Sequence, residues 1–153
     1  MFINRILNIK QLVSKKSHFL FGPRGTGKSS LLKHDLGNQA LIIDLLHSET
    51  YMKLMNNASQ LESMIELDKK PFVVIDEIQR VPELLNEVHR LIENKQIRFL
   101  LTGSSARKLK HQGVNLLAGR ARQAELYPLT YHELSNFNLS RQFNAFCATI
   151  KLV

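Results

Sequence analysis

Five short apolar runs divide the chain, and most of them are continuous instead of alternating with polar residues. They cover residues 18–21, 39–44, 71–76, 97–102 and 122–127. Continuous apolar runs of this length are typical of strands that are buried on both faces of a parallel sheet. The pattern therefore predicts five parallel strands.

Apolar residues at helical spacing fill the stretches around these runs. The expected helices are 2–14, 28–36, 58–67 and 82–93, with Gly37 closing the second. The last one is the clearest, because Pro82 suits a first helical turn and four apolar residues then follow on one face. Strands that alternate with helices indicate an α/β fold with helices on both faces of the sheet, right-handed crossovers and ligand sites at the carboxyl ends of the strands.

Length and composition are those of an ordinary globular domain. The chain has 153 residues, of which 44% are apolar and 22% charged, and no apolar stretch approaches the roughly 20 residues of a membrane span. The N-terminus has no signal-peptide core. The single cysteine, Cys147, cannot form an internal disulfide, which agrees with the reducing cytoplasm. We expect a core domain over residues 1–135 and a short tail, 136–153, that ends abruptly, as the beginning of a lid or second domain would.

A phosphate-binding loop directly follows the first strand. Residues 22–29 match the pattern G-x-x-x-x-G-K-[ST] without a break. Where a glycine-rich loop connects a strand to a helix, its backbone N–H groups surround a phosphate. The positive end of the helix dipole is directed at the same anion. The residues expected to contact a nucleoside triphosphate are Gly22, Pro23, Arg24, Gly25, Thr26, Gly27, Lys28, Ser29 and Ser30.

Two carboxylates at the end of the third strand complete the expected site. The Lys28 ammonium can reach the β- and γ-phosphates, and the Ser29 hydroxyl can bind Mg²⁺. Asp76 closes the strand and is expected to contact the same Mg²⁺, usually through water. Successive residues at a strand end point in different directions. Glu77 is therefore expected to face the space beyond the γ-phosphate, where it can orient a water and accept its proton.

The sequence motifs after the third strand indicate which nucleotide is bound. A GTPase would be expected to show Asp-x-x-Gly after the third strand and Asn-Lys-x-Asp after a later one. Asp76 is followed by Glu-Ile-Gln, and residues 94–97 read Asn-Lys-Gln-Ile, without the aspartate that reads guanine. The expected ligand is therefore ATP with Mg²⁺.

Hydroxyl groups end the fourth strand, where they would lie beside the γ-phosphate. Thr102 and Ser104 are the candidates for a sensor of hydrolysis. The alternative is a serine-rich turn that leads into a helix. The sequence does not choose between the two hydroxyls.

The net charge of +8 raises the question of nucleic-acid binding. The basic residues form three loose clusters, 5–16, 24–33 and 98–122, and the middle one coincides with the phosphate loop. The sequence has no arginine-rich tract, no zinc-finger spacing and no aromatic residues interleaved with the basic ones. A solvated basic surface is the simplest interpretation, and any nucleic-acid binding is expected to be weak. The six histidines are scattered without the spacing of metal ligands.

With these segments in place, the chain resembles a group of prokaryotic AAA-type ATPases, in which a P-loop domain is joined to a C-terminal domain of poorly understood function. The resemblance rests on motifs that follow one another through nearly the whole chain. They are the phosphate loop at 21–29, VIDEIQRVPELL at 74–85, LLTGSS at 100–105, LAGRA at 117–121 and LYPLTYHEL at 126–134. The first two indicate only a P-loop ATPase, whereas the last three are more specific.

The resemblance implies a P-loop NTPase fold, a three-layer sandwich whose five-stranded parallel sheet has the order 5-1-4-3-2. It also implies that Arg120 acts near a nucleotide, as an arginine finger of its own chain or of a neighbour; the alternative is a salt bridge that fixes the turn before the fifth strand. Members of the group are more than twice as long, so lid closure, assembly and full turnover stay open.

The function that follows is a Mg²⁺-dependent ATPase domain that drives a conformational change in a protein partner or in a missing C-terminal domain. One alternative is a nucleotide-binding fragment that hydrolyses little by itself. The other is a small-molecule kinase, for which the Asp76-Glu77 pair is less natural because it would more readily serve water.

Overall fold

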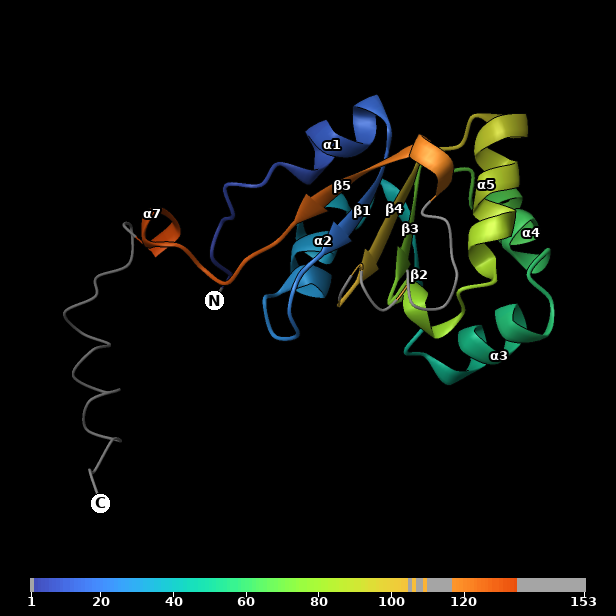
Figure 1. Ribbon diagram of the computed structural model, residues 1–153, viewed down its shortest axis with the longest axis horizontal. Coiled ribbons are helices and arrows are strands. Elements are labelled where there is room, and N and C mark those ends of the chain that lie inside the picture. Colours follow the sequence, from blue (N-terminus) through green and yellow to red (C-terminus); the bar gives the residue numbers. More distant parts are fainter. Residues whose placement is uncertain (1, 105, 107–108, 110–116, 135–153) are drawn as a thin grey trace, which may run out of the picture.

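The computed structural model describes residues 2–104, 106, 109 and 117–134 (Figure 1). Its strands are β1 (Ser17–Phe21), β2 (Ala40–Asp44), β3 (Phe72–Asp76), β4 (Phe99–Gly103) and β5 (Ala121–Glu125). Its helices are α1 (Ile9–Lys15), α2 (Lys28–Leu36), α3 (Ser48–Asn56), α4 (Gln60–Asp68), α5 (Leu84–Lys95) and α7 (Tyr131–Leu134). Two short 3₁₀ turns are η1 (Ile78–Arg80) and η2 (Leu117–Gly119).

The strands form one parallel sheet in the order β2-β3-β4-β1-β5. This is the expected order, 5-1-4-3-2, read from the other edge, so the P-loop NTPase fold is confirmed. β1 lies between β4 and β5, with Phe19 opposite Leu101 on one side and Gln123 on the other. Because the strands run in the same direction, the ends of β1, β3 and β4 meet at one edge of the sheet.

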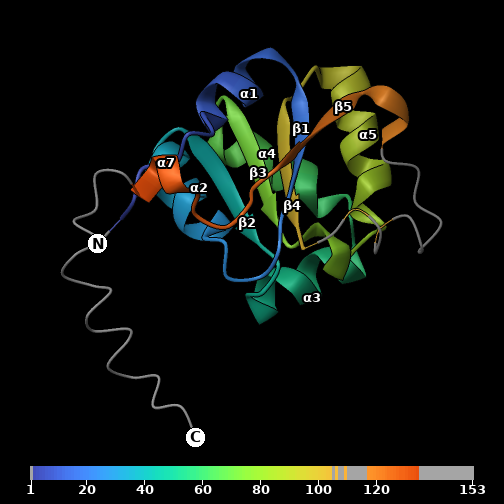
Figure 2. The same ribbon diagram turned by 60° about the vertical axis from the view of Figure 1, so that its left-hand side comes forward.

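Alternate residues of the central strands enter two separate cores. Phe19, Ile75 and Leu101 pack on one side with residues of α3, α4 and α5. Leu20, Val74 and Leu100 pack on the other side with residues of α1 and α2. Figures 1 and 2 show these two groups of helices on opposite sides of the sheet. Both faces of the sheet are covered, which is why its strands are continuous apolar runs.

The expected helix over residues 2–14 is wrong in its first half. α1 begins only at Ile9, after Asn8, whose side chain accepts a hydrogen bond from the Gln11 N–H at 3.0 Å and caps the helix. The preceding segment is bound elsewhere: the Ile6 N–H donates to Glu133 Oε1 at 3.0 Å. Tertiary contacts therefore override the helical pattern of residues 2–7.

The sequence pattern also missed α3. Only Leu54 of this helix is buried, whereas Met52 and Met55 are exposed, so its apolar stripe is narrow. α5 begins at Leu84, two residues later than expected, because Pro82 lies in a tight turn in which its carbonyl accepts the Leu85 N–H at 3.0 Å. Helices α2 and α4 and the five strands agree with expectation to within two residues at each end, an ordinary difference, whereas α7 was not expected.

The tail, residues 136–153, lies outside the described residues, and so does Cys147. The division of the chain at residue 135 therefore stays a prediction. Across the described parts of the chain, no helix combines the length and the apolarity that crossing a membrane requires.

Candidate nucleotide-binding site

The phosphate loop joins the end of β1 to the start of α2. Gly25 and Gly27 have φ angles of +80° and +85°, a left-handed region that glycine enters without strain. Gly27 caps α2, and its carbonyl accepts the Leu31 N–H at 2.9 Å. The Thr26 hydroxyl donates to the Pro23 carbonyl at 2.9 Å and closes the loop on itself. The loop is therefore folded over the amino end of a helix, where an anion is stabilised.

Gly22 lets the loop begin in contact with the segment that follows β5. A Cβ at this position would lie 2.2 Å from the Leu126 carbonyl oxygen. The Leu126 N–H donates to the Phe21 carbonyl at 2.7 Å. Any side chain at residue 22 would therefore separate the phosphate loop from this segment.

A cavity of about 630 Å³ opens at the loop. Most of its lining belongs to the predicted phosphate-contacting set, and Glu77 reaches the same space from the end of β3. The lining residues are Arg24, Gly25, Gly27, Lys28, Ser29, Ser30, Leu46 and Glu77. Sequence reasoning missed Leu46, although its place just after β2 could have revealed it, because ligands bind beyond the carboxyl ends of parallel strands.

Lys28 is a charged residue that is only 6% exposed. Its Nζ donates to the carbonyls of Gly22 at 2.6 Å and Pro23 at 3.0 Å. Burial lowers the pKa of Lys28 below its ordinary value, while the charges of Glu77 and Asp76 act in the opposite direction. An ammonium has three donors, so one remains for a ligand in the cavity. Little water competes for it, which favours a phosphate oxygen as its partner.

Asp76 connects the phosphate loop to two strands. The Ser29 hydroxyl donates to Asp76 Oδ2 at 2.6 Å. The Thr102 hydroxyl, from β4, donates to Asp76 Oδ1. The aspartate is buried, with 3% of its surface exposed. The two metal candidates, Ser29 and Asp76, are therefore in direct contact.

Glu77 adopts a backbone conformation that is unusual for a residue with a side chain. Its φ of 62° and ψ of 45° lie in the left-handed region, which costs about 1–2 kcal/mol. Its N–H donates to Thr102 Oγ1 at 3.2 Å. The turn directs the Glu77 side chain into the phosphate cavity, whereas Asp76 stays buried against Ser29. The two neighbouring carboxylates therefore have different surroundings.

Gln79 contacts Glu77 and was missed by sequence reasoning. Its Nε2 donates to Glu77 Oε2, and its Oε1 is buried without a partner among the described residues. A Cβ at Gly103 would lie 2.7 Å from this Oε1. Glycine at the end of β4 therefore makes room for the amide that holds Glu77. Only the position of Gln79, two residues after Glu77, could have suggested this contact.

The two candidate sensor hydroxyls lie in different surroundings. Thr102 is fully buried, and its hydroxyl is used by Asp76 and by the Glu77 N–H. Ser104 lies one residue beyond β4, and its buried Oγ has no partner in the part of the chain that the structure describes. The structure thus brings Thr102 to the metal candidates, and a sensor role for either residue stays a prediction.

Most of the chain matches a known protein family. A family described as an AAA domain matches residues 14–135, which include the phosphate loop, Asp76, Glu77 and the segment 126–134. The chain belongs to the AAA domain family. The resemblance to AAA-type ATPases is therefore confirmed over these residues.

Solved structures show the same fold at low sequence identity. The AAA domain is similar to the Walker-type ATPase PABY2304 of Pyrococcus abyssi, with a TM-score of 0.61 and 20% identity over 91% of this chain and 56% of that one. It is also similar to PCH-2 of C. elegans, with a TM-score of 0.50 and 21% identity over 89% of this chain and 43% of that one. The chain thus spans about half the length of these structures. None of the curated proteins matches it.

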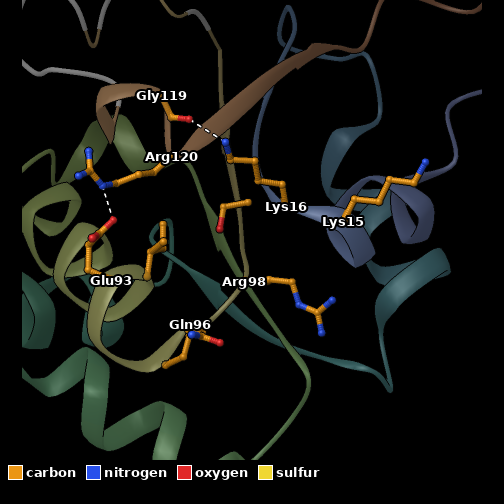
Figure 3. Close-up of a pocket in the computed structure, with 10 residues that line it drawn as sticks. Lys15, Lys16, Glu93, Gln96, Arg98, Gly119 and Arg120 are labelled. Carbon is orange, nitrogen blue, oxygen red and sulfur yellow. Dashed lines mark hydrogen bonds and ion pairs between the residues drawn. The ribbon is translucent and has the colours of Figure 1, made fainter.

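Arg120 of the AAA domain lies at the amino end of the parallel strands, whereas the phosphate loop lies at their carboxyl end. It precedes β5, whose first residue, Ala121, pairs with Ser17 at the start of β1, whereas the phosphate loop follows the end of β1. Its Nε forms an ion pair with Glu93 of α5 (Figure 3). This geometry separates Arg120 from the phosphate loop of its own chain and agrees with the salt bridge. Contact with a neighbouring chain's nucleotide stays a prediction.

A cleft of about 720 Å³ lies beside Arg120 (Figure 3). Its charged lining residues are Lys15, Lys16, Arg98, Arg120 and Glu93. Lys16 Nζ donates to the Gly119 carbonyl at 2.9 Å, and Arg98 donates to the Ser14 carbonyl at 2.5 Å. Within the described part of the chain, these two charges pair with backbone carbonyls and not with carboxylates, and basic residues outnumber Glu93 in the lining, so the cleft is positively charged.

A second cavity, of about 300 Å³, adjoins the phosphate cavity. Gly25, Gly27 and Ser30 line both. Its remaining lining comes from segments far apart in the sequence: Phe2, Ile3, Arg5, Thr26, Pro128 and Leu129. An apolar cavity beside a phosphate site suits the flat face of a nucleoside base. Except for Thr26, which belongs to the predicted phosphate loop, sequence reasoning missed these residues, because no local pattern connects the N-terminus with residues 128–129.

Proposed function

We propose that this AAA domain binds ATP with Mg²⁺ and hydrolyses the bond between the β- and γ-phosphates. The observation that carries this proposal is the meeting of Lys28 and Ser29 with Asp76 and Glu77 at the carboxyl edge of the sheet. Membership of the AAA domain family supports ATP binding. The phosphate loop at the amino end of α2 supports a triphosphate in particular.

Ser29 and Asp76 suit a magnesium ion. Their side-chain oxygens are 2.6 Å apart, and hydroxyl and carboxylate oxygens are ligands that this hard cation prefers. We assign Ser29 to direct contact and Asp76 to the water shell of the ion. Bound there, magnesium would neutralise negative charge that develops on the phosphates. The Thr102 hydroxyl, which donates to Asp76, holds the carboxylate in place.

Glu77 is the proposed general base. Its carboxylate accepts a proton from a water while the oxygen of that water attacks the γ-phosphorus, and the bond to the bridging oxygen breaks to leave ADP and phosphate. Lys28 donates to the phosphate oxygens. Gln79, which donates to Glu77, is a positioning residue for the base.

The cavity lined by Phe2, Ile3, Pro128 and Leu129 is the proposed site of the adenine. It adjoins the phosphate cavity through shared residues of the loop, so one nucleotide can occupy both. The sequence lacks the motifs that read guanine. We therefore assign the site to ATP in preference to GTP.

Hydrolysis is proposed to drive a conformational change in a protein partner or in a further C-terminal domain. The chain spans only about half the length of the structures that it resembles. Arg120 lies too far from the phosphate loop of its own chain to act there. The domain by itself is therefore proposed to be a mostly monomeric and slow ATPase.

The positively charged cleft beside Arg120 supports a second role, weak binding of nucleic acid. Cations along such a cleft can pair with successive phosphates of a backbone. Among the described residues that line the cleft, none is aromatic, so these residues offer no surface on which bases could stack. The proposed binding is therefore independent of base sequence.

Glu77→Gln tests the proposed hydrolysis, with Glu83→Gln, an exposed acid that does not line the phosphate cavity, as the matched control. The glutamine keeps the shape and removes the base, so Mg²⁺·ATP should bind as in the wild type while turnover falls by about 10²-fold or more. Calorimetric titration measures the binding, and phosphate release measures the turnover. Wild-type turnover in Glu77→Gln would exclude Glu77 as the base.

A further inference from the structure

A buried ion pair joins the two ends of the described chain. Arg5 Nε lies 2.9 Å from Glu133 Oε1, although 128 positions separate the two residues. Their side chains are only 6% and 4% exposed. Both views show the N-terminal segment running beside the segment that leads into α7 (Figures 1 and 2). We call this pair the Arg5–Glu133 clasp.

The other two nitrogens of Arg5 bind two further segments. One donates to the Thr26 carbonyl in the phosphate loop at 2.8 Å. The other donates to the Tyr127 carbonyl, just after β5, at 2.6 Å. A guanidinium directs its donors in fixed planar directions, so a single side chain connects α7, the phosphate loop and the segment after β5.

Both carboxylate oxygens of Glu133 also accept hydrogen bonds from other groups. Its Oε1 also accepts the Ile6 N–H at 3.0 Å, and its Oε2 accepts the Thr130 N–H at 2.8 Å and the Thr130 hydroxyl at 3.1 Å. Hydrogen bonds from Arg5 and from these backbone groups lower the pKa of Glu133 to about 2. The carboxylate is therefore charged and fully bonded at neutral pH.

The segments that the clasp joins are the walls of the second cavity. Arg5 and Thr26 line it directly, with Phe2 and Ile3 on one side and Pro128 and Leu129 on the other. Phe2 in addition stacks on His34 of α2, with ring centroids 3.8 Å apart. The position of each wall relative to the phosphate loop thus depends on the clasp.

We propose that Arg5 and Glu133 are positioning residues that set the shape of the nucleoside pocket, so that they determine affinity for the base and ribose but not for the phosphates. This inference rests on the proposed binding of ATP. It also gives a role to the segment 126–134, which sequence analysis singled out without a function: Tyr127 and Thr130 fix its path, and Glu133 anchors it to Arg5.

Two conservative variants and two ligands test the clasp. Arg5→Lys keeps the charge but loses the planar fork, and Glu133→Gln keeps the shape but loses the charge. The ligands are ATP and inorganic tripolyphosphate, which offers the phosphates without the nucleoside. Glu62→Gln is the matched control, because Glu62 pairs with Arg90 and Lys95 on α5, outside both cavities.

We expect both clasp variants to bind ATP about tenfold more weakly than the wild type, with tripolyphosphate affinity unchanged and Glu62→Gln like the wild type for both ligands. Equal losses for the two ligands, or ATP affinity unchanged, would overturn the role of the clasp. Wild-type protein that binds neither ligand would overturn the ATP proposal itself.

Hydrogen exchange in the wild-type protein gives a second test that needs no variant to fold. ATP should slow amide exchange in residues 2–7 and 126–134, and tripolyphosphate should slow it only in the phosphate loop. The same protection of these segments by both ligands would overturn the proposed link to the nucleoside.

Discussion

The Ser29 hydroxyl lies 2.6 Å from Asp76 Oδ2, although 47 positions separate the two residues in the sequence. This hydrogen bond brings the phosphate loop, at the end of β1, to the end of β3. Between these strands lies β4, which adds the Thr102 hydroxyl to the same carboxylate. The parallel sheet thereby places two candidate magnesium ligands and the group that orients one of them at a single point.

Asp76→Asn is expected to weaken the dependence of ATP binding on Mg²⁺. The amide cannot accept both hydroxyl hydrogen bonds and carries no charge for the ion. The Mg²⁺ concentration that gives half-maximal binding should rise about tenfold or more, while ATP binding without Mg²⁺ should change little. Asp44→Asn, at the end of the neighbouring β2, is the control, and equal Mg²⁺ dependence in the two variants would contradict the assignment.

Lys28→Ala is expected to lower ATP affinity by about tenfold or more, at least about 1.4 kcal/mol. The substitution removes the ammonium of a buried residue that lines the phosphate cavity and has one donor beyond its two bonds to backbone carbonyls. Calorimetric titration with ATP and GTP measures the loss and the selectivity. Lys33→Ala, an exposed lysine on the same helix, should bind as the wild type does. Equal wild-type affinity for ATP and GTP would contradict the assignment to adenine.

Turnover per molecule should be slow and independent of protein concentration in the isolated domain, and Arg120→Ala should not change it. Arg120 lies at the amino end of the strands, away from the phosphate loop at their carboxyl end, so we expect it not to act on a nucleotide bound to its own chain. Phosphate release over an about hundredfold range of concentration checks this, with Arg122→Ala, on the exposed edge strand, as the control. A rate that rises with concentration and collapses only in Arg120→Ala would show that chains assemble and that the arginine acts on a neighbour.

Acid should weaken the fold through Glu133. Its pKa is about 2 in the folded protein against an ordinary 4.5, chiefly because of the hydrogen bond from Arg5. A carboxylate with a depressed pKa contributes stability that is complete above its unfolded pKa and is lost as the pH falls toward its folded pKa. Thermal unfolding of the wild type and of Glu133→Gln should therefore differ near neutral pH and converge between pH 4.5 and 2. A difference that stays constant with pH would rule out the charge of Glu133 as its source.

Binding of single-stranded DNA, measured by fluorescence anisotropy, should be weak, independent of base sequence and steeply dependent on salt. Lys15→Glu places a negative charge in the cleft of Figure 3 and should reduce the slope of log affinity against log salt by about 1 or more. Lys53→Glu, on α3, changes the net charge equally outside the residues that line the cleft and should have a smaller effect. Tight binding that survives added salt would point to another surface.

Local patterns in the sequence were sufficient for the five strands, for α2, α4 and α5, and for the phosphate loop. Apolar runs, helical spacing and the glycines of residues 22–27 each depend on neighbours within a few positions, so they can be read directly. The carboxyl-end rule for parallel sheets then indicated that Asp76 would approach Ser29. The same local reasoning failed for residues 2–7, whose helical pattern is overridden by contacts with Glu133 and Thr26.

Contacts between distant segments could be established only in the folded chain. Phe2 and Leu129 together line the second cavity, Arg5 and Glu133 form the clasp, and no spacing in the sequence links either pair. Arg120 shows the converse: its motif suggested the nucleotide, but the register of β5 on β1 places it at the far edge of the sheet. Side chains separated by more than a hundred positions meet only through the packing of the sheet, and so their relation is a property of the three-dimensional fold.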